Sequence, residues 1–172
     1  ADWKKMMEMT WFVQSFFCLK SSYFVCLFLN LHLGQPIMDF AQFFLKRIRD
    51  HNKTSLPILF NEIKRVENFL DSFIDGDPQA DFSDLDLQQV RWPIEEISFI
   101  KLSLQQELFY AELRIVVDEF IISKGLDCEP ELLNQVFDYQ QSRIINPAGP
   151  SKKNLSFSVI SLVASSIPLC KS

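Results

Sequence analysis

The chain has 172 residues, with 22 acidic and 17 basic side chains and a formal net charge of −5. This length fits one domain of ordinary size, and a hydrophobic share of 48% argues against an intrinsically disordered protein. The acidic balance gives no electrostatic reason to expect nucleic acid or an anionic membrane as a partner.

Phenylalanine is abundant and glycine is scarce, with 17 Phe against four Gly. Many large apolar side chains and few glycines favour helices packed on helices over a turn-rich β fold. We therefore expect an all-α protein, an irregular bundle of five to six helices with a short strand near the C-terminus. A single helical domain is expected over residues 1–150, with an acidic loop at 71–91 and a Ser-rich tail at 151–172.

The stretch from Thr10 to Pro36, TWFVQSFFCLKSSYFVCLFLNLHLGQP, is apolar enough to raise the question of a membrane span. A membrane helix needs about 20 predominantly apolar residues. Lys20 divides the stretch, and the unbroken apolar core after it, Tyr23 to Leu29, is too short. A signal peptide fits poorly because Glu8 interrupts the region and no small-x-small cleavage site follows. We expect two helices of a protein core and no membrane partner.

Capping residues place these first two helices. Asp2 is expected to cap a helix that runs to about Leu19, and Ser22 to cap a second helix over Tyr23–Leu33. Gly34 then ends the second helix, because glycine adopts the left-handed conformation at little cost. The second helix is apolar nearly all round, so it needs cover on most sides.

Two amphipathic helices follow. Asp39 is expected to cap a helix over Phe40 to Arg49, on which the basic cluster of Lys46, Arg47 and Arg49 forms a solvated face. Thr54 or Ser55 is then expected to open a fourth helix with Pro57 in its first turn, where a missing N–H costs nothing. The apolar face of this helix contains Leu59, Ile63, Val66, Leu70 and Phe73.

An acidic segment follows the fourth helix, with six Asp and no basic residue from Asp71 to Asp86. An EF-hand loop that starts at Asp75 would place Ala80 where the loop needs Gly, and would close on Asp86 in place of Glu. We interpret the segment as a solvated loop between two halves of the domain and not as a calcium site.

A long central helix is predicted from Trp92-Pro93 to Lys124-Gly125, with Glu95 and Glu96 in its first turn. One sustained apolar face is expected to contain Ile97, Ile100, Leu104, Leu108, Ala111, Ile115 and Ile122. A second apolar set broadens that face, and its members are Phe109, Leu113, Val116, Val117 and Phe120.

Pro130 and Glu131 open the last predicted helix. The motif NPAGP at 146–150 ends it, and LSFSVISLV at 155–163 is compatible with a short strand. The inner face of this helix is expected to contain Leu132, Leu133, Val136, Phe137, Gln140 and Ile144.

Residues with catalytic or metal-binding chemistry are few and scattered. His32 and His51 belong to no metal-binding pair, and no phosphate loop or nucleophile-elbow motif is present. The four cysteines, at 18, 26, 128 and 170, form no C-x-x-C motif, which favours reduced thiols in the cytoplasm. We therefore assign no catalytic, cofactor-binding or metal-binding residue. The aromatics expected in the core or at an interface are Trp3, Trp11, Trp92, Tyr110 and Tyr139.

Two passages together resemble a known family. They are TWFVQSFFCLKSSYFVCLFLNLHLGQPIMDFAQFF (Thr10–Phe44) and, about ninety residues later, ELLNQVFDYQQSRIINP (Glu131–Pro147). This pattern of apolar and aromatic positions resembles the helical C-terminal region of cobalamin (B12)-binding radical SAM enzymes. The resemblance implies a helical region that follows a radical SAM barrel and a cobalamin-binding domain. It also implies a 4Fe–4S cluster, S-adenosylmethionine and cobalamin bound in those upstream domains.

The cluster of that family needs a C-x3-C-x2-C motif, and this chain has none, so no residue here is expected to bind it. The chain begins with Ala1, and helix-like sequence follows at once, so we expect a piece of a longer protein. The first hypothesis for function is a non-catalytic accessory domain that covers the substrate side of such an enzyme, with the upstream domains as partner.

Two alternatives stay open. One is a free-standing helical module that binds another protein and has no enzymatic activity. The other is a helical bundle that binds a small ligand, or an enzyme whose site is assembled from the scattered acids Glu107, Glu112, Asp118 and Glu119.

Overall fold

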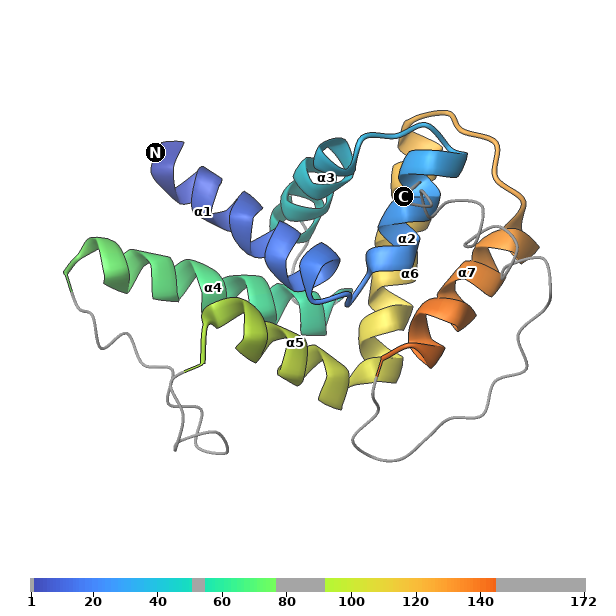
Figure 1. The fold of residues 1–172 in the computed structure, drawn as a ribbon. Coiled ribbons are helices and arrows are strands. Elements are labelled where there is room, and N and C mark those ends of the chain that lie inside the picture. Colours follow the sequence, from blue (N-terminus) through green and yellow to red (C-terminus); the bar gives the residue numbers. More distant parts are fainter. Residues whose placement is uncertain (1, 51–54, 77–91, 145–172) are drawn as a thin grey trace, which may run out of the picture.

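The computed structural model describes residues 2–50, 55–76 and 92–144, and within these ranges the chain is all-α (Figure 1). Seven α-helices occur there, against five to six expected, together with two π-helical segments, η1 (Val13–Cys18) and η2 (Phe28–His32). The α-helices are α1 (Asp2–Phe12), α2 (Tyr23–Leu27), α3 (Ile37–Asp50), α4 (Pro57–Ile74), α5 (Ile94–Leu104), α6 (Gln106–Ser123) and α7 (Pro130–Ser142). The predicted acidic loop at 71–91 begins too early, because residues 71–74 form the end of α4. Residues 77–91 of that loop and the predicted strand at 155–163 lie outside the described residues.

The apolar N-terminal stretch forms two helices, as predicted. α1 continues into η1, and α2 continues into η2 as far as His32. Ser22 precedes α2, but its hydroxyl donates to the carbonyl of Phe16 and does not cap the helix. Gly34 has a φ of +66°, which is the left-handed conformation expected after the helix end.

Three further predicted caps are wrong. Asp2 is the first residue of α1 and not the residue before it. Asp39 lies in the first turn of α3, because the Pro36 carbonyl already accepts the N–H groups of Asp39 and Phe40 and the helix begins earlier. At α4 the N-cap position belongs to Leu56, which has no side chain that could cap.

The predicted long helix is broken at Gln105, where φ is −116° and ψ is 35°. α5 ends one residue before the break and α6 begins one residue after it. Because the break changes the direction of the chain, the expected continuous apolar face does not form. On α6 the core side is the second set, Phe109, Leu113, Val116, Val117 and Phe120, and the exposed large apolar residues near and on this helix are Leu104, Leu108, Ile115 and Ile122.

One buried cluster contains residues from every α-helix. At its centre are phenylalanine rings from α1, η1 and α3: Phe12 stacks on Phe16 at 4.9 Å between centroids, and Phe44 lies edge-on to both. Aromatic pairs in these geometries contribute about 0.5–1.5 kcal/mol beyond their buried area. The high phenylalanine content is thus explained by packing between helices.

α6 is the central helix, since it packs on α3, α4, α5 and α7. In Figure 1, α1, α4 and α5 lie together on one side of the molecule, and α2, α6 and α7 lie together on the other. The two halves of the N-terminal stretch therefore pack in different places, α1 beside α4 and α5, and α2 beside α7.

Candidate functional site

The four scattered acids proposed for chemistry do not share a partner. Glu119 of α6 accepts two hydrogen bonds from the guanidinium of Arg47 on α3. Asp118 pairs with Arg114 one turn before it, at 3.0 Å. Glu107 is exposed at the start of α6. The first contact joins α3 to α6 and the second lies within α6, and these three acids form no convergent group of carboxylates.

The fourth acid, Glu112, caps a helix that is far away in the sequence. Its two carboxylate oxygens accept the backbone N–H groups of Ile58 and Leu59 in the first turn of α4, at 2.9 and 2.8 Å. Burial raises the pKa of the Glu112 carboxyl, and the two N–H groups offset that increase only in part. Sequence reasoning missed this role because it searched for the cap among the residues next to α4.

The basic cluster of α3 is not the solvated face that the sequence suggested. Arg47 is bound to Glu119, and Arg49 forms ion pairs with two acids, Glu8 of α1 at 2.5 Å and Glu67 of α4 at 2.9 Å. Lys46 alone of the three keeps no described ion pair and is exposed. The cluster thus fixes the contact of α3 with three other helices.

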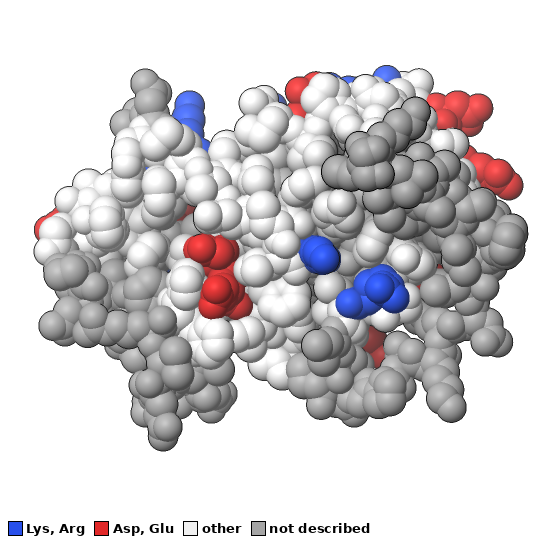
Figure 2. Space-filling model, in the orientation of Figure 1, with Lys and Arg blue, Asp and Glu red and all other residues white. Residues whose placement is uncertain are grey.

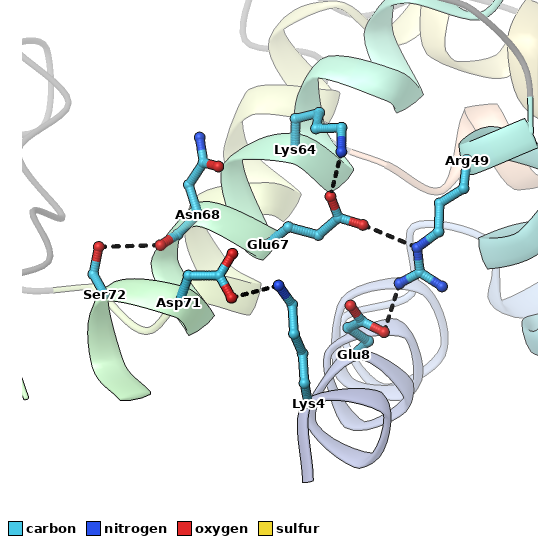
Figure 3. Close-up of polar contacts among 8 residues, drawn as sticks. All are labelled: Lys4, Glu8, Arg49, Lys64, Glu67, Asn68, Asp71 and Ser72. Atoms are coloured by element: carbon cyan, nitrogen blue, oxygen red, sulfur yellow. Dashed lines mark hydrogen bonds and ion pairs between the residues drawn. The ribbon is translucent and has the colours of Figure 1, made fainter. Parts of the chain in front are cut away.

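Figure 3 shows how Arg49 joins α1, α3 and α4. One carboxylate oxygen of Glu67 pairs with Arg49, and the other pairs with Lys64 at 2.6 Å. Nearby, Lys4 pairs with Asp71 at 2.5 Å. Burial by itself would raise the pKa of Glu67, but the hydrogen bonds and charges of Lys64 and Arg49 outweigh it and leave that pKa below its ordinary value.

A second polar cluster, centred on the buried side chains of Gln140 and Tyr110, fixes the corner between η1 and α2. The Gln140 amide of α7 donates to the Lys20 carbonyl at 2.7 Å and accepts the Phe24 N–H at 2.8 Å. Tyr110 of α6 donates to the Ser21 carbonyl at 2.7 Å. The cluster gives hydrogen-bond partners to backbone groups that would otherwise lack them. A buried backbone group without a partner costs free energy, and this explains why a glutamine lies on the inner face of α7.

A third cluster holds α1, α4 and α5 together. The Trp11 indole N–H and the Arg65 guanidinium both donate to the hydroxyl of Ser98, at 2.8 and 2.9 Å, and Ser98 donates in turn to the Ile94 carbonyl. Arg65 is also paired with Glu62, which is buried. Trp11 and Tyr110 are therefore core aromatics, as expected from the sequence.

The histidines and cysteines offer no assembled site within the described ranges. His32 stacks on Phe28 at 5.0 Å between centroids, and His51 lies outside those ranges. Cys26 is buried beside the Ser22 hydroxyl, whereas Cys18 is exposed. Among the residues that the structure describes, no group of three His, Cys, Asp or Glu could hold a metal ion.

An apolar patch lies where the start of α1 meets the end of α4. Trp3 stacks on Phe73, with 5.8 Å between ring centroids and 10° between planes. The side chains of Trp3, Met6, Phe73 and Ile74 are 38–56% exposed, and we name these four residues the N-terminal patch. Four large apolar side chains gathered beside an ion-pair network are a feature of interaction surfaces.

A second apolar surface runs along α6. Leu108, Ile115 and Ile122 are 60%, 44% and 76% exposed, and we name them the outer row. Sequence reasoning placed these residues in the core. The sequence did contain a signal against that placement, namely the second apolar set on the same helix. When two apolar sets lie on different sides of one helix, its neighbours can cover one set and leave the other exposed to solvent. Elsewhere, the face drawn in Figure 2 carries charged groups only in a few separate spots among its described residues.

None of the described helices alone has the length and apolarity of a membrane span. One bent pair, Trp3–Cys18 with Tyr23–His32, meets the length and composition test when its two parts are joined, with 102° between them.

Comparisons of the chain with protein-family models, with curated proteins and with solved structures gave no match.

Proposed function

We propose that this chain is a non-catalytic helical accessory domain, the C-terminal region of a larger cobalamin-dependent radical SAM enzyme, and that it covers the substrate side of that enzyme in the cytoplasm. In this proposal the 4Fe–4S cluster, S-adenosylmethionine and cobalamin belong to upstream domains. The upstream domains are also the partner of this chain, and nucleic acid and membrane have no part in its function.

The observation that carries the proposal is the packing of the two passages that resemble the family. They are about ninety residues apart in the sequence, yet Phe24 of the first donates its N–H to Gln140 of the second, and the ring of Phe24 lies edge-on to Tyr139 at 4.7 Å. Gln140 also holds the corner at Lys20. Two passages that resemble one family region and pack on each other behave as one structural unit, which supports inheritance of that unit as a whole.

The distribution of polar groups supports a non-catalytic role. Three of the four candidate acids are occupied in contacts between or within helices, with Glu112 on backbone N–H groups, Asp118 on Arg114 and Glu119 on Arg47. Carboxylates held in this way have their lone pairs engaged, and they serve packing before chemistry. The N-terminal patch, at the first helix of the chain, offers apolar area for contact with a preceding domain.

The upstream coding sequence tests the proposal. We expect an open reading frame that continues upstream of Ala1 and encodes a C-x3-C-x2-C motif. The extended polypeptide, purified without oxygen, should contain iron, sulfide and cobalamin. Deletion of residues 1–172 from it should leave the content of all three unchanged and weaken substrate binding. A stop codon in frame directly upstream of Ala1 would rule the proposal out.

The exposed N-terminal patch favours one second candidate, a free-standing helical module that binds another protein. In that case the chain is expressed alone and no cluster motif precedes it. Replacing Trp3 with Lys would then abolish binding to the partner, whereas replacing Met38, an exposed apolar residue at the start of α3, would not. In the accessory-domain proposal the same Trp3 variant weakens a contact within one polypeptide.

A further inference from the structure

A continuous row of aromatic rings lies at the corner between η1 and α2. Phe17 packs against Tyr23 with 4.8 Å between ring centroids, and Tyr23 lies edge-on to Phe24 at 5.1 Å. Phe24 lies edge-on in turn to Tyr139 of α7, at 4.7 Å. All four residues are half-buried, and we name them the aromatic row. The row thus joins η1, α2 and α7 and keeps part of each residue open to solvent.

Two exposed cations accompany the aromatic row. Lys20 lies in the corner itself, where its carbonyl accepts the Gln140 amide of α7 at 2.7 Å. Arg143 follows Tyr139 by one helical turn, and its guanidinium lies over the Tyr139 ring, 5.9 Å from the centroid. Two basic spots lie near each other in Figure 2, over the region where Figure 1 draws the corner before α2 and the end of α7.

Neither cation is neutralised by an acid in the described part of the chain. Lys20 and Arg143 form no ion pair there. The sequence contains no acid between Glu8 and Asp39. In α7, Asp138 is five positions before Arg143, which is about 140° around the helix. A protein with a net charge of −5 therefore keeps uncompensated positive charge at this corner, and charge complementarity favours a partner with negative groups.

The aromatic row also offers polar atoms without partners. The hydroxyl groups of Tyr23 and Tyr139 make no hydrogen bond to any described residue, whereas the buried Tyr110 donates to the Ser21 carbonyl at 2.7 Å. A tyrosine at the surface combines a large apolar ring with one polar atom, and tyrosine and arginine are enriched among the residues that contribute most to protein interfaces. The composition of this corner is therefore typical of a protein-binding surface.

From these observations we propose that the aromatic row, with Lys20 and Arg143, is a docking surface for an acidic segment of another protein. Apolar side chains of that segment pack on the rings, and its carboxylates pair with the two cations. The surface is separate from the N-terminal patch, where Trp3 stacks on Phe73. The inference goes beyond the proposed function, because an accessory domain and a free-standing module can both present such a surface.

An acidic peptide fits this corner better than single-stranded nucleic acid, which also binds to aromatic rings and cations. The net charge of −5 repels a polyanion, and two cations release few counterions. An acidic peptide needs only one or two carboxylates near the cations, and the rings contact its apolar side chains.

Fluorescence anisotropy of the full 172-residue chain with a labelled peptide of repeating Asp-Phe-Glu-Leu tests the proposal. A dissociation constant on the order of 10⁻⁵ to 10⁻⁴ M is expected, since small interfaces bind weakly. A peptide with Asn and Gln in place of the acids should bind at least about fivefold more weakly, and added salt should weaken binding of the acidic peptide. A peptide with Ala in place of Phe and Leu should also lose affinity.

Variants of the chain test which residues bind the peptide. Lys20→Glu and Arg143→Glu should each weaken binding at least about fivefold. Lys46→Glu makes the same change at an exposed lysine of α3 and should leave binding as in the wild type. The double variant Lys20→Glu with Arg143→Glu should bind a peptide of repeating Lys-Phe-Lys-Leu more tightly than the wild type does. This gain of binding distinguishes a changed surface from a chain that fails to fold.

Three results would overturn the proposal. A full chain that does not bind the acidic peptide would do so, and it would leave the aromatic row to residues 145–172 of the chain or to a different partner. Binding that neither Lys20→Glu nor Arg143→Glu weakens would place the peptide elsewhere. Tighter binding of an oligothymidylate than of the peptide would assign the row to nucleic acid instead.

Discussion

Glu112 caps α4 by accepting the backbone N–H of Leu59 at 2.8 Å, although the two residues are 53 positions apart. The second oxygen of the carboxylate accepts the N–H of Ile58. The first turn of a helix leaves its N–H groups without partners inside the helix, and a nearby side chain usually satisfies them. Here that side chain comes from the central helix, so this cap forms only when α6 is packed against the start of α4.

The first prediction concerns this long-range cap. Glu112→Ala should lower the free energy of unfolding by about 1–2 kcal/mol, because two N–H groups lose their acceptor. Glu107→Ala changes an exposed acid on the same helix and should alter it by less than about 0.5 kcal/mol. Urea denaturation at pH 7 measures both. An effect of Glu112→Ala equal to that of the control would contradict the cap.

The second prediction concerns pH and Glu67. Its pKa is lowered in the folded protein by Lys64 and Arg49 despite the opposing effect of burial, so its ionised form stabilises the fold. For an acid with a lowered pKa, the stabilisation is complete above the unfolded-state pKa, about 4.3, and is lost as pH falls through the folded-state value. The difference in unfolding free energy between wild type and Glu67→Gln should therefore be largest near neutral pH and shrink below about pH 4.

Denaturation curves of both proteins from neutral to acidic pH provide the measurement. A gap between wild type and Glu67→Gln that stays constant across this range would show that the ion pair with Arg49 adds nothing to stability.

The third prediction concerns Lys20, which has a φ of +69° at the corner between η1 and α2. A residue with a Cβ atom pays about 1–2 kcal/mol for this left-handed conformation, and glycine avoids that cost. Lys20→Gly should therefore raise thermal stability, whereas Lys5→Gly, within α1, should lower it by about 1 kcal/mol. Calorimetry distinguishes the two outcomes, and equal destabilisation by both variants would argue that the corner is not strained.

The fourth prediction concerns the reactivity of the thiols. Burial raises the pKa of Cys26 to about 12, and the hydrogen bond with Ser22 lowers it only in part, so almost no thiolate exists at pH 8. Cys18 is exposed. We expect an alkylating reagent to modify Cys18 in the native protein and Cys26 only after denaturation, as read by peptide mass spectrometry. Rapid native labelling of Cys26 would show that α2 separates from the core readily.

The positions of several helices could be predicted from local sequence patterns. The spacing of Phe40 and Phe44, the Gly34 stop and the Pro130 start all correspond to elements of the structure, because amphipathic periodicity and chain-stopping residues act within a few positions. The inner position of Gln140 also followed from spacing alone. The spacing could not identify the hydrogen-bond partner of the buried Gln140 amide, which is the backbone carbonyl of Lys20.

The sequence by itself therefore determined the class of fold and the places where most helices begin and end. The tertiary structure decided which apolar set of α6 faces inward and which becomes the outer row, because that choice depends on the neighbours that reach each side of the helix. It also decided that Glu112 caps α4 and that Arg49 pairs with Glu8, because a cap or an ion pair requires a group that is brought close in space, and the order of residues along the chain does not identify that group.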